Sequence, residues 1–127
     1  MKRYISSAVR DISQESPGIR LRLARDIATD PKILRRLVDS DTDPDIRNDA
    51  QITLNKIAWG EKLLRRTDID PELLASVVRV SGCDGAHYRY YVAQHPNTSD
   101  ATLVHLLNDN SREVRREAER ALKERGL

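Results

Sequence analysis

Apolar residues recur along this chain every three or four positions, which is the spacing of one face of an α-helix. Two clear series are Ile46, Ala50, Leu54 and Ile57, and then Val114, Ala118 and Leu122. Alternation of apolar and polar residues, which is typical of half-buried strands, is absent over any useful length. The pattern predicts an all-α protein of about seven or eight short helices with short connections.

Proline marks four predicted helix starts, because each proline follows a residue with a short side-chain oxygen. The pairs are Ser16-Pro17, Asp30-Pro31, Asp43-Pro44 and Asp70-Pro71. The oxygen can accept a free N–H group of the first turn, and proline fits the first helical position, where no donor is needed. Pro96 follows a helical pattern instead, so that helix is predicted to end near Gln94.

The chain also repeats itself. One gap-free alignment pairs PGIRLRLARDIATDP (17–31) with AHYRYYVAQHPNTSD (86–100). A second similarity relates TDPKILRRLV (29–38) to IDPELLASVV (69–78) and to SDATLVHLL (99–107). The repeated unit is a helix pair whose second helix opens with an apolar residue and an arginine. The arginines in question are Arg20, Arg47, Arg89 and Arg115.

The repeats do not have a constant length. Residues 55–67 are predicted to be an insertion that extends the helix starting near Pro44, with Gly60 as a candidate break. Residues 1–15 are predicted to form a helix that caps the open end of the repeats, which then occupy 16–125. The whole chain, 1–127, is therefore predicted to be a single domain.

The best-matching copy is VAQHPNTSDATLVHLLNDNSREVRREA (92–118), with an A-x-x-P-x-T segment, paired leucines and Asp109 six residues before Arg115. Asp41 and Arg47 repeat that spacing. This pattern resembles the HEAT-like α-solenoids, most closely the leucine-rich repeat variant family. The resemblance implies a right-handed α-α superhelix of about three to four helix pairs that serves as a scaffold for binding other macromolecules. The family's type member carries an iron–sulfur cluster on N-terminal cysteines that this sequence lacks, so no cofactor is expected.

Charge and cysteine content narrow the functional classes. Twenty-two Lys and Arg against twenty Asp and Glu give a net charge of +2, unlike the strongly basic balance of a dedicated nucleic-acid binder. Cys83 is the one cysteine and cannot form an internal disulfide, so a reducing, cytoplasmic location is expected. No apolar run approaches the length needed to span a membrane, and no membrane partner is expected.

No catalytic or metal-binding set is complete in the sequence. Cys83 and His87 stand four residues apart near a helix start, but a Cys–His nucleophile also needs an orienting group and an oxyanion site. The alternating carboxylates of DSDTDPD (39–45) could indicate a calcium-binding loop. However, Pro44 and Ala50 occupy the sixth and twelfth positions, where an EF-hand loop needs Gly and Glu. We therefore expect a non-enzymatic protein without a metal site.

The four repeat arginines allow two interpretations. They could form a basic stripe that binds phosphates, or they could bond aspartates and free helix carbonyls and so tie successive repeats together. The second interpretation is favoured, and it assigns a structural role to Arg20, Arg47, Arg89 and Arg115.

The repeat alignment also sorts the aromatic stretch 86–100. Tyr88 and Val92 align with core positions, whereas Tyr91 aligns with solvent-type residues. Spaced by four, His87, Tyr91 and His95 would share one exposed helix face on the concave side of the stack. Acidic residues on that side predict an acidic groove with an aromatic centre. The predicted contact residues are His87, Tyr90, Tyr91, His95, Asp49 and Glu117.

The first functional hypothesis is a scaffold that binds a protein or peptide partner on this face, with Tyr91 as an anchor. The second is nucleic-acid binding, because some proteins similar to this fold are alkylpurine-DNA glycosylases. A basic patch could then form, and Tyr90 or Trp59 could stack on bases. The patch residues would be Arg35, Arg36, Lys62, Arg65 and Arg66. The low net charge favours the first hypothesis. The chain is expected to be a monomer or weak homo-oligomer, or one subunit whose apolar end faces a partner.

Overall fold

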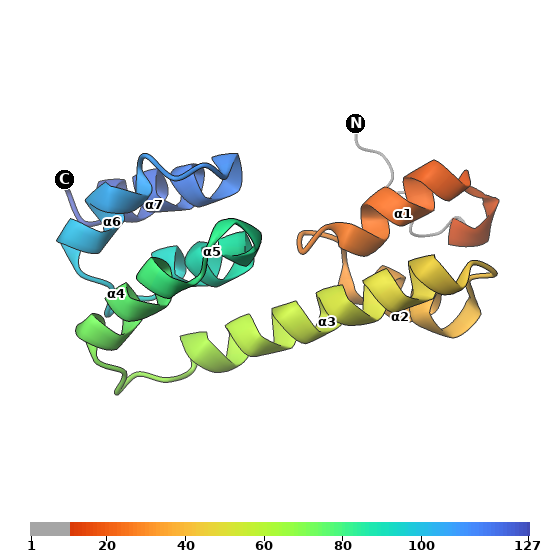
Figure 1. The fold of residues 1–127 in the computed structure, drawn as a ribbon, viewed down its shortest axis with the longest axis horizontal. Helices are drawn as coiled ribbons and strands as arrows, with labels where there is room; N and C mark the ends of the chain where they lie inside the picture. The colour runs from red at the N-terminus through yellow and green to blue at the C-terminus, as the bar shows by residue number, and fades with distance from the viewer. Residues whose placement is uncertain (1–10) are drawn as a thin grey trace. The chain divides into compact units, whose positions relative to one another are not determined.

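The computed structural model describes residues 11–127. Within that range the chain forms seven α-helices, two short 3-10 helices and no strand, which confirms the all-α prediction (Figure 1). The α-helices are α1 (Pro17–Arg25), α2 (Pro31–Ser40), α3 (Pro44–Leu64), α4 (Pro71–Val80), α5 (Ala86–Gln94), α6 (Asp100–Leu106) and α7 (Arg112–Glu124). The 3-10 helices are η2 (Ile12–Gln14) and η3 (Cys83–Gly85). Most of the predicted capping helix, 1–15, lies outside the described residues.

The helix boundaries follow the predicted start and stop signals. α1, α2, α3 and α4 all begin at the predicted prolines. The Asp30 carboxylate accepts the N–H of Lys32 at 2.9 Å, and the Asp70 carboxylate accepts the N–H of Glu72 at 2.9 Å. α5 ends at Gln94, two residues before Pro96, as predicted.

The predicted extension of α3 is present, but the candidate break at Gly60 is not. α3 runs as one 21-residue helix through Gly60. A Cβ atom at Gly60 would overlap the ring of Tyr91 on α5. Gly60 therefore allows α5 to approach the last turns of α3 closely, which is a packing role rather than a helix-breaking one.

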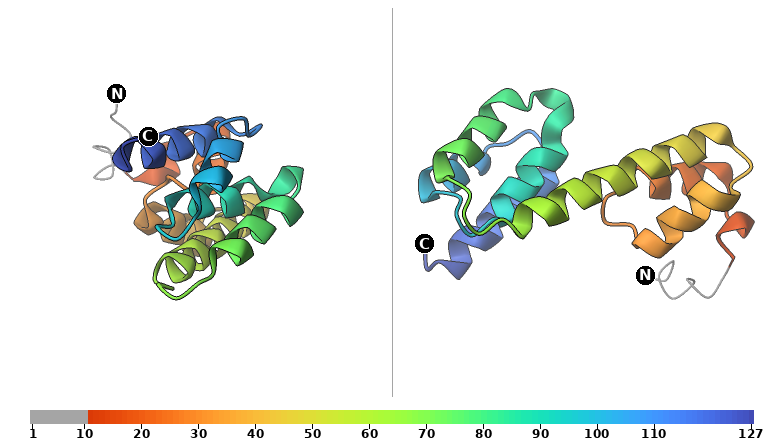
Figure 2. Two further views of the ribbon diagram at one scale, coloured as in Figure 1. Left: turned by 90° about the vertical axis from the view of Figure 1, so that its left-hand side faces the viewer. Right: turned by 90° about the horizontal axis from the view of Figure 1, so that it is seen from below.

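The chain divides into two compact units, Met1–Ala58 and Trp59–Leu127, and α3 contributes residues to both. In the first unit, one apolar cluster joins α1, α2 and α3. Its buried members are Ala24, Leu34, Leu37, Ile46, Ala50 and Ile57. In the second unit, α7 packs against α5 and α6, and α4 packs against α5 (Figure 2). None of the helices between residues 11 and 127 has the length and apolar character that a bilayer crossing requires.

An arginine clamp holds the three helices of the first unit. The Arg20 Nε donates to Asp41 Oδ2 at 2.7 Å, and the Arg20 Nη1 donates to the carbonyl of Glu15 at 2.7 Å. The Arg47 Nη1 donates to the backbone carbonyl of Asp41 at 2.6 Å. One aspartate in the loop before α3 thus binds an arginine from α1 and another from α3, which fixes the loop between the two helices.

The second unit has the same arginine clamp. The Arg89 Nε donates to Asp109 Oδ1 at 2.7 Å, and the Arg115 Nη1 donates to the Asp109 carbonyl at 2.7 Å. The Arg89 Nη1 also donates to the Ser81 hydroxyl at 2.9 Å and to the Gly82 carbonyl at 2.5 Å. The motif of α1, α2 and the start of α3 therefore recurs as α5, α6 and α7, held by equivalent polar contacts.

A threonine in each copy marks the same turn. The Thr29 hydroxyl donates to the Leu23 carbonyl at 2.8 Å after α1, and the Thr98 hydroxyl donates to the Val92 carbonyl at 2.6 Å after α5. Both threonines are buried. The two stretches that align in the sequence therefore form the same local structure in the two units.

Candidate functional site

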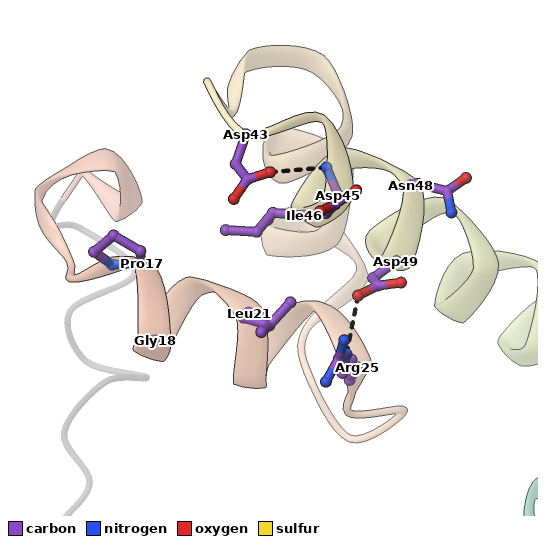
Figure 3. Close-up of a pocket in the computed structure, with 9 residues that line it drawn as sticks. All are labelled: Pro17, Gly18, Leu21, Arg25, Asp43, Asp45, Ile46, Asn48 and Asp49. Carbon is purple, nitrogen blue, oxygen red and sulfur yellow. Dashed lines mark hydrogen bonds and ion pairs between the residues drawn. The ribbon is translucent and has the colours of Figure 1, made fainter.

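A cleft of about 410 Å³ opens in the first unit between α1 and the beginning of α3 (Figure 3). Its lining residues are Pro17, Gly18, Leu21, Arg25, Asp43, Asp45, Ile46, Asn48 and Asp49. The side chains of Leu21 and Ile46 lie between the two helices (Figure 3). Ile46 is only 1% exposed, so the half-buried Leu21 is the accessible apolar side chain at the floor of the cleft. The aspartates come from the loop before α3 and from its first turns, so the rim is acidic on that side.

Gly18 leaves room for the cleft at the start of α1. No heavy atom lies within 4 Å of the position that a Cβ would take there. In the second copy of the motif, His87 aligns with Gly18 and Tyr90 aligns with Leu21. The two copies share their scaffold but carry different side chains at these surface positions.

The cleft combines negative charge with one arginine. Asp43 caps α3, since its Oδ1 accepts the N–H of Asp45 at 2.9 Å. The Arg25 Nε donates to Asp49 Oδ2 at 2.9 Å, with side-chain exposures of 65% for Arg25 and 23% for Asp49. Three aspartates against one arginine give the lining a net negative charge. The helix dipole places a partial positive charge at the N-terminus of α3, which offsets part of the negative charge of Asp43 and Asp45.

The structure corrects the predicted exposure of two partner-binding residues. Tyr91 is 7% exposed and His95 is 1% exposed, so neither presents a surface to a partner. Tyr91 is buried where its ring packs onto Gly60, and its ring centroid lies 6.3 Å from that of Trp59. Burial raises the pKa of the Tyr91 hydroxyl, and Tyr90 and Glu61 raise it further. The hydroxyl therefore stays protonated and does not supply a general base.

His95 is buried because it holds two connections together. Its Nδ1 accepts the N–H of Asn97 at 3.0 Å, and its Nε2 lies 2.8 Å from the Arg66 carbonyl. An amide N–H only donates and a carbonyl only accepts, so the proton of the neutral ring is on Nε2. The Asn97 side chain donates to the carbonyls of Thr67 and Ile69 at 3.0 and 2.9 Å. The turn after α5 is thereby fastened to the connection between α3 and α4.

Replacing His95 tests this structural role. His95→Ala is expected to lower the free energy of unfolding by about 2–3 kcal/mol, because two partly buried backbone groups, the Arg66 carbonyl and the Asn97 N–H, lose their partner. His95→Asn is expected to lose less, since its side-chain oxygen can still accept the Asn97 N–H, as Asp26 does for the N–H of Ala28 in the first unit at 2.8 Å. Urea unfolding of both variants measures the difference. Equal losses would contradict the assignment of Nδ1 as a cap.

Tyr88 is also placed differently from its prediction as a core residue. It is 36% exposed, whereas Val92 is buried as predicted. The Tyr88 ring lies 4.8 Å from the Trp59 ring, nearly perpendicular to it at 84°, and 3.9 Å from the His87 ring. His87 and Tyr90 are half-buried. The aromatic residues of α5 thus contact one another and the Trp59 ring.

The two acidic residues predicted to contact a partner belong to different units. Asp49 lines the cleft of the first unit. Glu117, its counterpart on α7, accepts from Arg120 Nη2 at 2.8 Å on the same helix. An acidic groove centred on Tyr91 is not formed, because Tyr91 is buried. Asp49 was predicted from the sequence as a contact residue, whereas the cleft itself was not, although the glycine at position 18 was a possible sign of it.

The part of the chain that the structure describes contains no cluster of metal-ligating side chains. Across residues 11–127, no three His, Cys, Asp or Glu side chains come close enough together to hold a metal ion. Cys83 is an exposed free thiol in η3. The cleft offers negative charge, hydrogen-bond acceptors and the half-buried side chain of Leu21.

Comparisons with protein-family models, curated proteins and solved structures found no match. The class of the protein therefore follows from its own architecture. It is an all-α protein with two copies of a three-helix motif, each held by an arginine clamp, and an acidic cleft in the first copy.

Proposed function

We propose that this protein is an interaction module whose cleft binds a basic segment of a partner protein. The observation that carries the proposal is that the cleft places the half-buried apolar side chain of Leu21 beside the acidic rim of α3. Lysine and arginine have an aliphatic stem and a charged end, so both parts of such a side chain find a complement in the cleft. Charge complementarity of this kind also speeds and orients association.

The same charges argue against nucleic acid as the ligand of the cleft. Asp43, Asp45 and Asp49 would repel a phosphate backbone. Arg35 and Arg36 are exposed on α2, outside the cleft lining, and could still contact a nucleic acid at that surface. Duplex and single-stranded DNA therefore belong in the binding test as competing ligands.

The finer assignment of the fold, a right-handed HEAT-like superhelix, is part of this proposal. It is supported by the alternation of helix pairs along the chain and by the recurrence of the arginine clamp. In repeat proteins, equivalent scaffold positions are combined with variable surface positions that determine the ligand. The change from Gly18 and Leu21 to His87 and Tyr90 between the two copies follows that scheme.

Fluorescence polarisation with a labelled twelve-residue peptide of repeated glycine-serine-arginine tests the function. The wild type is expected to bind this peptide at low salt and not its glycine-serine-glutamate counterpart. Asp45→Asn is expected to weaken binding about three- to tenfold, because Asp45 is an exposed carboxylate of the rim. Asp39→Asn is the matched control, since Asp39 is exposed in the same unit and does not line the cleft.

Two results would overturn the proposed function. One is failure of the wild type to bind the arginine peptide at low salt, while its helical circular dichroism is intact. The other is tighter binding of duplex or single-stranded DNA than of the peptide, which would favour the nucleic-acid hypothesis.

A further inference from the structure

We infer that Arg25 is an internal competitor for the cleft, and that the side chain it competes with is an arginine of the partner. The inference rests on the proposed function and specifies the chemistry of its ligand. Arg25 already places a guanidinium on Asp49, at 2.9 Å between Nε and Oδ2, at the edge of the cleft (Figure 3). The Asp49 carboxylate therefore already binds a guanidinium group within the protein.

The exposure of the two side chains makes Arg25 replaceable. The Arg25 side chain is 65% exposed and the Asp49 side chain is 23% exposed. Ion pairs at such exposed positions contribute little to stability, because water and salt screen them and a long side chain must be held in place. An incoming guanidinium can therefore take Asp49 while Arg25 turns into solvent.

The second copy of the motif lacks this contact. Gln94 aligns with Arg25, and Glu117 aligns with Asp49. Glu117 is paired instead with Arg120, three residues along its own helix, at 2.8 Å. The arginine clamp is formed in that copy all the same, so the pair of Arg25 and Asp49 is a feature of the cleft rather than of the scaffold.

Arginine fits the cleft better than lysine. Its planar guanidinium can lie along an apolar side chain such as Leu21 and still donate in its plane to a carboxylate. A lysine ammonium is compact and strongly hydrated, and it loses more solvation when it enters a half-apolar cleft. The cleft should therefore distinguish the two cations rather than respond to charge alone.

The test compares Arg25→Gln with Arg22→Gln against arginine and lysine versions of the labelled peptide. Both variants remove one positive charge from α1, and Arg22 is exposed and lies outside the cleft lining. Arg25→Gln is expected to bind the arginine peptide about two- to fivefold more tightly than Arg22→Gln does. Wild type is expected to prefer the arginine peptide to the lysine peptide.

Each outcome separates this inference from the proposed function. If the wild type binds the arginine peptide and the two variants bind it equally, the competition is overturned and the proposed function stands. Weaker binding by Arg25→Gln would also overturn it, because Arg25 would then contact the partner directly. Equal binding of lysine and arginine peptides would overturn the selectivity. If none of the three proteins binds either peptide, both proposals fail.

Discussion

Arg89→Ala is expected to lower the free energy of unfolding of the second unit by about 3–5 kcal/mol. The side chains of Arg89 and Asp109 are 6% and 9% exposed, so the substitution leaves an aspartate buried without its counter-charge. The Ser81 hydroxyl and the Gly82 carbonyl also lose the hydrogen bond from Arg89, although the Gly82 carbonyl still accepts the N–H of Gly85. Removing one member of a buried ion pair is costly because the remaining charge is neither solvated nor paired.

Hydrogen exchange measured by NMR locates this effect. Amides of α5, α6 and α7 are expected to lose protection in Arg89→Ala, while a parallel loss in α1 and α2 is expected for Arg20→Ala. Arg120→Ala is the control, because the Arg120 side chain is 48% exposed and its pairs with Glu117 and Glu124 lie within one helix, so a change within about 0.5–1 kcal/mol is expected. A loss for Arg89→Ala no larger than that of the control would refute the structural role of the arginine clamp.

Gly60→Ala is expected to destabilise the protein by about 1–3 kcal/mol, although alanine is normally the better helix former. The added methyl group would overlap the buried ring of Tyr91, so either the ring or the helix must move. Gly18→Ala is the matched control, because Gly18 is also helical and has open space around it. That substitution is expected to stabilise by about 0.5–1 kcal/mol.

Thermal unfolding of the two glycine variants tests this: the melting temperature is expected to fall for Gly60→Ala and to rise for Gly18→Ala. Tyr91→Leu combined with Gly60→Ala is expected to cost less than the sum of the two single substitutions, since the smaller side chain relieves the overlap. If Gly60→Ala stabilised the protein as Gly18→Ala does, the close packing of α5 on α3 would be refuted.

Local features of the fold were readable from the sequence. The proline pairs gave the helix starts, because capping and proline geometry act within one turn. The alignment of Thr29 with Thr98 and of Arg20 with Arg89 predicted equivalent positions, and these residues make equivalent contacts. Such contacts depend on short segments that the two copies share.

The repeat alignment could not predict the burial of side chains that are covered by a segment outside their own repeat. Arg22 is exposed in the first unit, whereas its counterpart Tyr91 is covered by α3 at Gly60. Asp26 is likewise exposed, whereas its counterpart His95 lies under the connection between α3 and α4. The repeat alignment compares positions within the motif, and it contains no information on what packs against each copy from outside.

The candidate site was predictable only in part. Asp49 was identified from its place on the second helix of a repeat. The cleft itself lies between two helices, where Gly18 contributes no side chain and Leu21 and Ile46 come from opposite sides. A hollow of this kind depends on three-dimensional packing, which the pattern of apolar positions does not specify.

An NMR titration of the wild-type protein with the glycine-serine-arginine peptide tests the central claim most directly. The amide signals of Gly18 and Asn48, which line the cleft, are expected to shift on saturation. Those of the aligned residues His87 and Arg116 in the second copy are expected to stay in place. Binding confined to the first unit would support an arginine-binding cleft. Shifts of equal size in both copies, or none at Gly18 and Asn48, would contradict it.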